Sequence, residues 1–346
     1  MKNLFLRFLY HIGFVRLWCV IRRNKITILT LHGVMDTGVA AEWEPLRPRT
    51  SRELFDDTLN LAVRYFNFIS IDEAVDMLKG TSPVKSNSCV VTIDDGQLNN
   101  LQLALPILRK YNIPVVFYPT TGALEQTTPY WFDRLDYAIQ QAGLDGLKIN
   151  VGGIEVGIDQ SSRKSMALSL SKLIKSLKSK DQTEESFQSQ INQISSYLEN
   201  VSGKSIDDIG SGDLWSSTMS KQEIVACAEM DDVTLGSHTV NHVRLPFVDE
   251  DGMKRELKDS KLTLEGLMKR SCLHFCYPNG DWDARSAHAV QDAGYVSAVT
   301  TDVGCNAVGD NLYQLKRYSF PVKGTPIKAL FSIAGIMHFF SKALQV

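Results

Sequence analysis

The chain has 346 residues, of which 44% are hydrophobic, and 37 basic residues nearly balance 39 acidic ones. That length accommodates one large α/β domain or two ordinary domains, with a substantial buried core in either case. A formal net charge of −2 offers no electrostatic footprint for nucleic acid, so we expect no nucleic-acid partner.

The first 24 residues are apolar and aromatic, yet Arg7, His11 and Arg16 interrupt every run that would form the core of a signal peptide. We interpret residues 1–24 as a basic amphipathic helix of the kind that lies on anionic membrane surfaces. The alternative is an ordinary helix that caps the domain. Six scattered cysteines favour reduced thiols. We therefore expect a cytoplasmic protein with peripheral contact to the inner membrane face.

Seven short apolar runs that end in polar residues or glycine are typical of buried strands. They lie at residues 25–33, 88–96, 113–122, 233–239, 273–280, 296–302 and 313–320. Helical patterns lie between them, at residues 54–66, 101–111, 253–270 and 284–294. Strands and helices that alternate at this spacing predict an α/β fold of parallel strands joined by crossover helices.

Residues 145–212 break this alternation. LKINVGGIEVGI, residues 147–158, predicts a hairpin, and the Ser-, Lys- and Gln-rich stretch that follows predicts two surface helices. We interpret this segment as an insertion that acts as a lid or a substrate-selecting subdomain. The apolar residues 323–346 predict a C-terminal helix, and their apolar run at 329–340 is shorter than the roughly 20 residues that a membrane span needs.

Two adjacent carboxylates, Asp94 and Asp95, end the strand predicted at residues 88–96. Like charges at this separation repel and raise one another's pKa, so either the pair lies in a solvated turn or a cation binds there. The carboxyl edge of a parallel sheet or barrel is also where functional sites are built.

GSHTVNH, residues 236–242, follows another predicted strand. His238 and His242 would share one face if the chain turned helical here. Two imidazoles and one carboxylate leave metal positions open for water and substrate, as hydrolytic sites require. Alone, this histidine spacing is more often a chance pair on a helix surface. Combined with Asp94 and Asp95, it predicts a metal site in which one aspartate is a ligand and the other a free base.

Three motifs, TIDDG (residues 92–96), SHTVNH (237–242) and YPNG (277–280), resemble in order and spacing those of the polysaccharide deacetylase family, the NodB-homology domains of carbohydrate esterase family four. The resemblance extends over roughly residues 26–320, through segments such as YWFDRL and GYVSAVTTDVG. It implies an irregular seven-stranded (β/α) barrel, which we place at residues 25–322 with the insertion inside it.

The resemblance also implies roles for individual residues. Asp94 would be the general base. Three residues would bind a divalent metal, with zinc expected and Co²⁺, Ni²⁺ or Fe²⁺ as alternatives: Asp95, His238 and His242. The backbone N–H of Asn279 would help hold the oxyanion of the tetrahedral intermediate. Tyr277 and Pro278 would shape that loop beside the substrate.

Two departures from the family pattern affect the mechanism. Cys276 and Asn279 stand where the third motif has an arginine, which orients the base, and a tyrosine. QLKRYSF, residues 314–320, lacks the late histidine that supplies the general acid in many members. Cleavage of an amide needs a protonated leaving amine, and His32 in LHGV is our candidate for this acid. The alternative is that His32 is a buried structural histidine near the metal site.

Two further patterns have competing interpretations. Cys272, His274 and Cys276 alternate on one strand face and could suggest a thiolate zinc site, but a buried strand with small thiols is the commoner explanation. Trp131 and Asp133 in PYWFDRL could line a sugar cleft, whereas core packing explains Trp131 equally well.

The leading hypothesis is a metal-dependent hydrolase, a carbohydrate deacetylase, in which metal-activated water and Asp94 remove an N-acyl group, most naturally acetyl, from a sugar. The substrate would be a polysaccharide or a lipid- or nucleotide-linked precursor of exopolysaccharide biosynthesis. One alternative is a non-catalytic member that retains the metal and binds glycan. Another is a deformylase or an esterase on the same scaffold.

Overall fold

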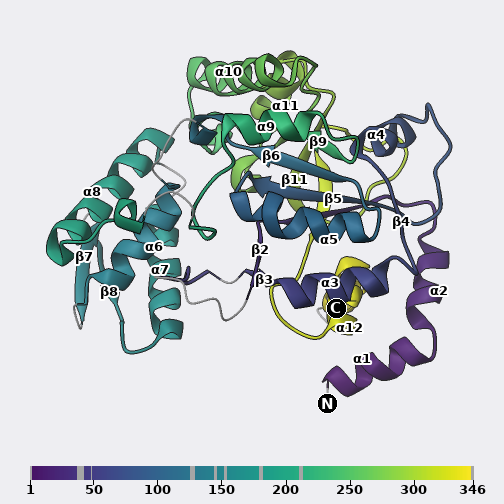
Figure 1. Cartoon of the computed structure of the whole chain (residues 1–346), viewed down its shortest axis with the longest axis horizontal. Coiled ribbons are helices and arrows are strands. Elements are labelled where there is room, and N and C mark those ends of the chain that lie inside the picture. Colours follow the sequence, from purple (N-terminus) through teal and green to yellow (C-terminus); the bar gives the residue numbers. More distant parts are fainter. Residues whose placement is uncertain are drawn as a thin grey trace.

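The computed structural model describes residues 2–36, 43–47, 49–124, 129–143, 146–151, 154–178, 182–209 and 213–343. Seven parallel strands form its centre in the order β10-β11-β12-β1-β5-β6-β9, with β4 paired to β5 (Figure 1). The strands are β1 (Thr27–Leu31), β2 (Val34–Met35), β3 (Thr50–Ser51), β4 (Asn67–Phe68), β5 (Ser88–Asp95), β6 (Val115–Pro119), β7 (Leu147–Val151), β8 (Ile154–Ile158), β9 (Val233–Leu235), β10 (His274–Cys276), β11 (Ser297–Val303) and β12 (Leu315–Ser319).

Helices surround this sheet and connect its strands. They are α1 (Lys2–His11), α2 (Phe14–Ile21), α3 (Arg52–Ala62), α4 (Ile71–Lys79), α5 (Leu105–Lys110), α6 (Trp131–Gln141), α7 (Arg163–Leu177), α8 (Glu184–Ser202), α9 (Lys221–Ala228), α10 (Glu250–Met268), α11 (Ala284–Asp292), α12 (Pro326–Ile333) and α13 (Ile336–Ala343). Short 3₁₀ or π turns are η1 (Asn100–Ala104), η2 (Thr121–Leu124), η3 (Ile206–Ile209), η4 (Leu245–Phe247) and η5 (Pro278–Gly280).

The sheet closes almost completely into a barrel at Ser237, just after β9. The Ser237 N–H donates to the His274 carbonyl, and the Cys276 N–H donates to the Ser237 carbonyl, each at 2.9 Å. These bonds connect the last strand of the sheet order to the first. All seven strands predicted from the apolar runs are present, and the predicted seven-stranded (β/α) barrel is confirmed.

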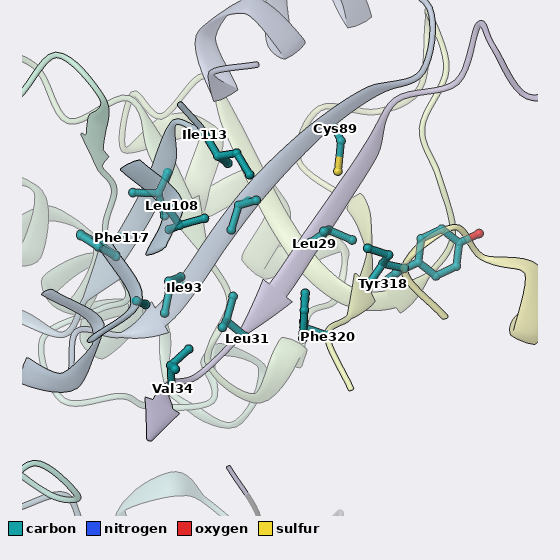
Figure 2. Close-up of a cluster of buried hydrophobic side chains, with 14 of the residues drawn as sticks. Leu29, Leu31, Val34, Cys89, Ile93, Leu108, Ile113, Phe117, Tyr318 and Phe320 are labelled. Atoms are coloured by element: carbon teal, nitrogen blue, oxygen red, sulfur yellow. The ribbon is translucent and has the colours of Figure 1, made fainter. Parts of the chain in front are cut away.

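Alternate residues of β5 face opposite sides of the barrel wall. Val91 and Ile93 pack outward with Leu29 of β1 and Phe117 of β6 against the surrounding helices (Figure 2). Val90 packs in a separate cluster with buried residues of α4, β1 and β6, inside the barrel. Because side chains alternate along a strand, Asp94 lies on the same inward face as Val90.

The insertion forms the predicted hairpin, β7 with β8 in antiparallel pairing, and the two predicted helices, α7 and α8. Residues 145, 152–153, 179–181 and 210–212 of the predicted span lie outside the described residues. A small core of its own joins the insertion to α6. Its centre consists of Leu135, Ile139, Leu173, Phe187 and Ile191.

Two helices, α1 and α2, replace the single helix predicted for residues 1–24, and they meet at an angle of 71°. The cause is Gly13, which adopts a left-handed conformation with φ of 80°. The C-terminal segment is also two helices rather than one, because Gly335 between α12 and α13 has φ of 73°. No single described helix is long and apolar enough to cross a membrane, although α1 and α2 together meet that test by length and composition.

Helix α2 and the insertion lie at opposite ends of the molecule. In Figure 1, α2 lies at the right end of the long axis, and α7 and α8 lie at the left. Because α2 leads directly into β1, it lies beside the amino ends of the strands. The carboxyl ends point toward α6 and the insertion.

Candidate functional site

The turn after β5 places Asp94 and Asp95 in different directions. Asp95 and Gly96 both adopt left-handed backbone conformations, with φ of 70° and 71°. A Cβ atom on Gly96 would lie 2.7 Å from Cα of Pro119, so only glycine fits the close approach to β6. Asp94 thus stays inside the barrel while Asp95 turns toward the histidines.

Asp95, His238 and His242 form a buried cluster whose three possible ligand atoms all lie within 4.8 Å of one another. Oδ1 of Asp95 lies 3.6 Å from Nε2 of His238 and 3.5 Å from Nε2 of His242. Both separations exceed a hydrogen bond, and Oδ1 is buried without a hydrogen-bond partner. Three convergent donor atoms with a free carboxylate oxygen fit a divalent cation.

His238 is oriented by the loop that closes the barrel. Its Nδ1 lies 2.7 Å from the carbonyl oxygen of Cys276. A carbonyl only accepts hydrogen bonds, so Nδ1 carries a hydrogen and Nε2 is the nitrogen that faces Asp95.

The loop that carries both histidines is not helical, which corrects the condition under which we expected them to share a face. Thr239 and His242 have positive φ values of 68° and 55°. Glu256 of α10 holds the loop, because its Oε2 accepts hydrogen bonds from the N–H groups of Val240 and Asn241 at 2.8 and 3.0 Å. The turn, rather than a helix face, brings the two imidazoles to Asp95.

The pKa values of this cluster show that it attracts positive charge. Burial raises the pKa of Asp95, but the nearby His238 and His242 imidazoles outweigh it and lower that pKa well below its ordinary value. Burial lowers the pKa of His238, but Cys276 and Asp95 raise it well above its ordinary value. Burial lowers the pKa of His242. A cation that displaces a proton from His238 fits this environment.

Asp94 forms a bidentate ion pair with Arg317, at 2.8 Å for both contacts. Thr30 Oγ1 also donates to Asp94 at 3.1 Å. Burial raises the pKa of Asp94, but the Arg317 guanidinium outweighs it and lowers that pKa to about 2. Asp94 is therefore ionised at neutral pH, as a general base must be.

Arg317 itself is completely buried, and hydrogen bonds to residues of the barrel strands fix the orientation of its guanidinium. Its Nε donates to the Thr300 carbonyl at 2.7 Å, and its Nη1 donates to Thr92 Oγ1 at 2.9 Å. Its Nη2 lies 3.4 Å from Sγ of Cys276. The guanidinium thus reaches the position beside Cys276 where the family motif has its arginine. Sequence reasoning missed Arg317, although an arginine inside a predicted buried strand was a usable signal.

These groups line a cavity of about 190 Å³ at the carboxyl edge of the strands. Among the predicted residues, the cavity wall includes His32, Asp94, Asp95, Trp131, His238, His242, Tyr277 and Asn279. Pro278 is buried at the start of η5, between two of them. His32 has an exposed side chain that lines this cavity. Desolvation by the surrounding protein lowers its pKa, and the charges of Asp95 and Asp94 oppose this effect.

The loop of η5 forms one side of the cavity. Asn279 has a positive φ of 58°, and its side-chain Oδ1 accepts a hydrogen bond from Lys178 Nζ at 3.1 Å. The Tyr277 hydroxyl donates to the Tyr313 carbonyl at 3.0 Å, so the phenol anchors the loop to the fold. This bond supports the prediction that Tyr277 shapes the loop.

The insertion and α6 complete the rim. Ile174 and Lys178, at the end of α7, line the cavity together with Trp131 and Phe132. Trp131 is half-buried and packs edge-on against Phe187 of α8 at 5.1 Å. Its contacts therefore combine core packing with a place in the cavity wall.

Two sequence alternatives are not supported. Asp133 is buried in an ion pair with Arg47 at 2.5 Å and does not line the cavity. His274 is bound through Nδ1 to Ser297 Oγ and through Nε2 to Asp72, at 2.9 and 3.0 Å. Within the described parts of the chain, the one cluster of three possible metal ligands is Asp95, His238 and His242, and no thiolate belongs to it.

The family model described as polysaccharide deacetylase matches residues 81–208 and 212–298. YxkH of Bacillus subtilis (strain 168), which is described as a polysaccharide deacetylase, is 26% identical over 85 residues. That alignment covers 25% of this chain and 30% of the length of YxkH.

Three solved structures share the fold. The Streptococcus pyogenes deacetylase PplD, in complex with acetate, has a TM-score of 0.57 at 17% identity, over 90% of this chain and 99% of its own. A de-N-acetylase from Aggregatibacter actinomycetemcomitans has a TM-score of 0.53 at 15% identity, over 89% and 100%. IcaB from Ammonifex degensii has a TM-score of 0.52 at 16% identity, over 90% and 97%.

Proposed function

Since the chain belongs to the polysaccharide deacetylase family, we propose that it hydrolyses an N-acyl group, most naturally acetyl, from a sugar of a polysaccharide or a glycan precursor. One observation carries this proposal. A single cavity contains an ionised carboxylate, Asp94, beside a separate cluster of Asp95, His238 and His242 that fits a cation. A base and a metal centre that face one space are the requirements of hydrolysis by an activated water.

Family members generally use a divalent metal, and the donor set fits zinc. Asp95, His238 and His242 would hold it, because they provide two imidazole nitrogens and one carboxylate oxygen within 4.8 Å of one another. When bound, such a cation supplies a Lewis acid for the acyl carbonyl and lowers the pKa of water. Co²⁺, Ni²⁺ and Fe²⁺ accept the same donors.

Asp94 would take the proton from the attacking water. Its pKa of about 2 keeps the carboxylate ionised, and Arg317 fixes its orientation through two hydrogen bonds. The water oxygen then bonds to the acyl carbon, whose carbonyl oxygen gains negative charge. The backbone N–H of Asn279, at the cavity wall, would stabilise that charge.

His32 would donate the proton that the departing amine needs when the C–N bond breaks. It lines the same cavity as Asp94, which places an imidazole on the wall of the space where the amine would depart. The products are the carboxylic acid and the free amine of the sugar. His32 would thereby supply the general acid, which many family members take from a late histidine that β12 lacks.

The first test is release of acetate from a panel of N-acetylated oligosaccharides and sugar precursors, with metal supplied. Asp94→Asn should abolish release, and Asp231→Asn, at an exposed carboxylate, should not. Release that persists at the wild-type rate in Asp94→Asn would reject Asp94 as the base. Formate or ester products would identify the deformylase or the esterase on this scaffold.

Metal content tests the centre without reference to activity. His238→Ala should reduce the bound metal measured by elemental analysis, whereas His288→Ala, far from the cluster, should leave it unchanged. Wild-type stoichiometry in His238→Ala would reject the ligand assignment. His32→Ala should bind metal normally and lose most of its turnover, and full activity across the pH range would place the acid elsewhere.

The non-catalytic alternative is weaker than it was from sequence alone. It rested on the arginine missing from the third motif and on the missing late histidine. Arg317 supplies a guanidinium beside Asp94 and Cys276, which removes the first of these grounds. A protein that only binds glycan has little use for a carboxylate ionised and oriented in this way. Metal binding without turnover on any substrate in the panel would favour the binding protein.

A further inference from the structure

The outer face of α1 and α2 is apolar, although one side of both helices is already packed on the domain. Leu6 and Leu9 of α1 and Val15 and Cys19 of α2 are buried in the main core. Seven large apolar side chains point away from it and are more than half exposed: Leu4, Phe5, Phe8, Ile12, Leu17, Val20 and Ile21. The described parts of the remaining chain show no comparable run.

These two helices are held firmly in place, so the exposed face is not a loose end. The Trp18 indole N–H donates to the Ala334 carbonyl at 2.8 Å, and Arg22 donates to the same carbonyl at 3.0 Å. Phe14 stacks on Phe331 and Phe340 of the C-terminal helices. We call the seven exposed side chains on α1 and α2 the terminal apolar face.

Charge identifies what covers this face. Residues 1–25 contain six basic and no acidic residues, and residues 323–346 contain three basic and no acidic residues. Since the whole chain has a formal charge of −2, the remainder is strongly acidic. Arg7, Arg16 and Arg23 are exposed beside the terminal apolar face, and none forms an ion pair within the described parts of the chain.

We propose that the terminal apolar face docks on the surface of an anionic lipid bilayer. Helices with aromatic and aliphatic side chains on one face and basic residues at its edges insert to the depth of the lipid headgroups. Unpaired arginines then lie close to lipid phosphates, which attract them within a Debye length. A second copy of this chain would instead place six or more like charges against one another.

The test is flotation of the full-length protein with vesicles of phosphatidylcholine, alone or mixed with phosphatidylglycerol. The protein should float with the mixed vesicles and far less with the neutral ones, and binding should fall as salt is added. Phe5→Ser/Phe8→Ser should weaken binding by about tenfold or more. Leu168→Ser/Leu262→Ser removes side chains of similar exposure elsewhere and should bind like the wild type.

Arg7→Gln/Arg16→Gln separates the charge from the apolar contact. It should reduce binding to the mixed vesicles by about tenfold and leave the weak binding to neutral vesicles unchanged. Because Phe5, Phe8, Arg7 and Arg16 are all exposed, thermal unfolding of both double variants should match that of the wild type. Acetate release in solution should also be unaffected, so failure of this proposal is separate from failure of the proposed function.

Two results would overturn the proposal. The first is a wild-type protein that stays with the unbound fraction for both kinds of vesicle. The second is a dimer, measured by light scattering, that becomes a monomer in Phe5→Ser/Phe8→Ser, since the face would then belong to a second copy of this chain.

Discussion

Arg317 and Cys276 show how one site can keep a function while its motif changes. The arginine that the third motif lacks comes instead from β12, and its guanidinium touches both Asp94 and Cys276. Sequence reasoning recognised the missing arginine but not its replacement. The replacement depends on the register in which Val303 pairs with Arg317 across an irregular stretch of β11 and β12, and no local pattern encodes that register.

Arg317→Gln tests this arrangement through pH. The folded protein lowers the pKa of Asp94 to about 2, so the wild-type base is ionised at every practical pH. Without the guanidinium, the main effect that opposes burial is lost, and the pKa of Asp94 rises. The acid limb of the pH–rate profile should therefore move to higher pH, with a marked loss of acetate release at neutral pH.

Arg317→Lys provides the matched control, because a cation stays beside Asp94 although the second hydrogen bond is lost. It should recover part of the rate and keep the acid limb near its wild-type position. An unchanged profile in Arg317→Gln, for a variant that still unfolds cooperatively, would contradict the role of Arg317.

The raised pKa of Asp136, in α6, predicts how the stability of the protein depends on pH. It accepts hydrogen bonds from Leu46 N–H at 2.8 Å and Gln140 Nε2 at 2.7 Å, yet burial raises its pKa to about 6. A folded pKa above the unfolded value favours folding at low pH, and this contribution is lost as pH rises from about 4 through 6. Asp136→Asn removes this pH dependence, although its NH2 group cannot accept one of the two hydrogen bonds. Relative to wild type, the variant should therefore gain at most about 3 kcal/mol of unfolding free energy between pH 4 and pH 8.

Denaturant unfolding at pH 8 and at pH 4 measures this effect. The unfolding free energy of Asp136→Asn, relative to wild type, should be lower at pH 4 than at pH 8, because the wild-type carboxyl is protonated in the folded state at pH 4. Asp292→Asn, at an exposed position of α11, should show no such pH dependence. A difference in unfolding free energy between Asp136→Asn and wild type that is the same at pH 8 and at pH 4 would reject the raised pKa.

Strands and helices were predicted well wherever the spacing of the apolar residues and the length of the segment indicated the same structure. The seven strands, the hairpin and the two inserted helices all appear because their apolar residues recur at the spacing of their own structure. The failures lie at positive φ values. Gly13 and Gly335 break the terminal helices, and Thr239 and His242 replace an expected helix with a turn. Side-chain patterns do not encode these backbone conformations for residues other than glycine.

The turn after β5 gives a prediction at the level of an element. Gly96→Ala places a methyl group 2.7 Å from Pro119 and adds strain at a φ of 71°. We expect a loss of more than about 1 kcal/mol in unfolding free energy and reduced metal binding, because Asp95 precedes this turn. Gly157→Ala, in open space on β8, should be neutral by both measurements.

Helix α7 brings a cation to the cavity through Lys178, which contacts Asn279. Lys178 touches neither Asp94 nor the metal cluster, so Lys178→Gln should raise KM for oligosaccharides and leave kcat nearly unchanged. Lys175→Gln, exposed one turn earlier, is the control. Equal KM values for Lys178→Gln and wild type would show that the insertion does not select substrate at this point.

Across the whole molecule, the two ends of the chain form one unit that no single segment predicts. Trp18 and Arg22 reach Ala334 over more than 300 residues of sequence. Trp18→Phe retains an aromatic ring next to Phe339 but loses the bond to Ala334. Thermal unfolding should show a cost of about 1 kcal/mol. Trp282→Phe, whose indole bonds to exposed Asp302, should cost less.

The opposition of the two barrel edges limits what the protein can reach. The α2 part of the terminal apolar face lies beside the amino ends of the strands, and the cavity opens at their carboxyl ends, a strand length of at least roughly 16 Å away. A protein seated on lipid by that face would hold its cavity at the end of the molecule that lies away from α2. A sugar joined directly to a lipid diphosphate would lie beneath it, whereas the far units of a growing glycan would pass its entrance. The length of the glycan, more than the lipid to which it is joined, would then decide which of its sugar units is modified.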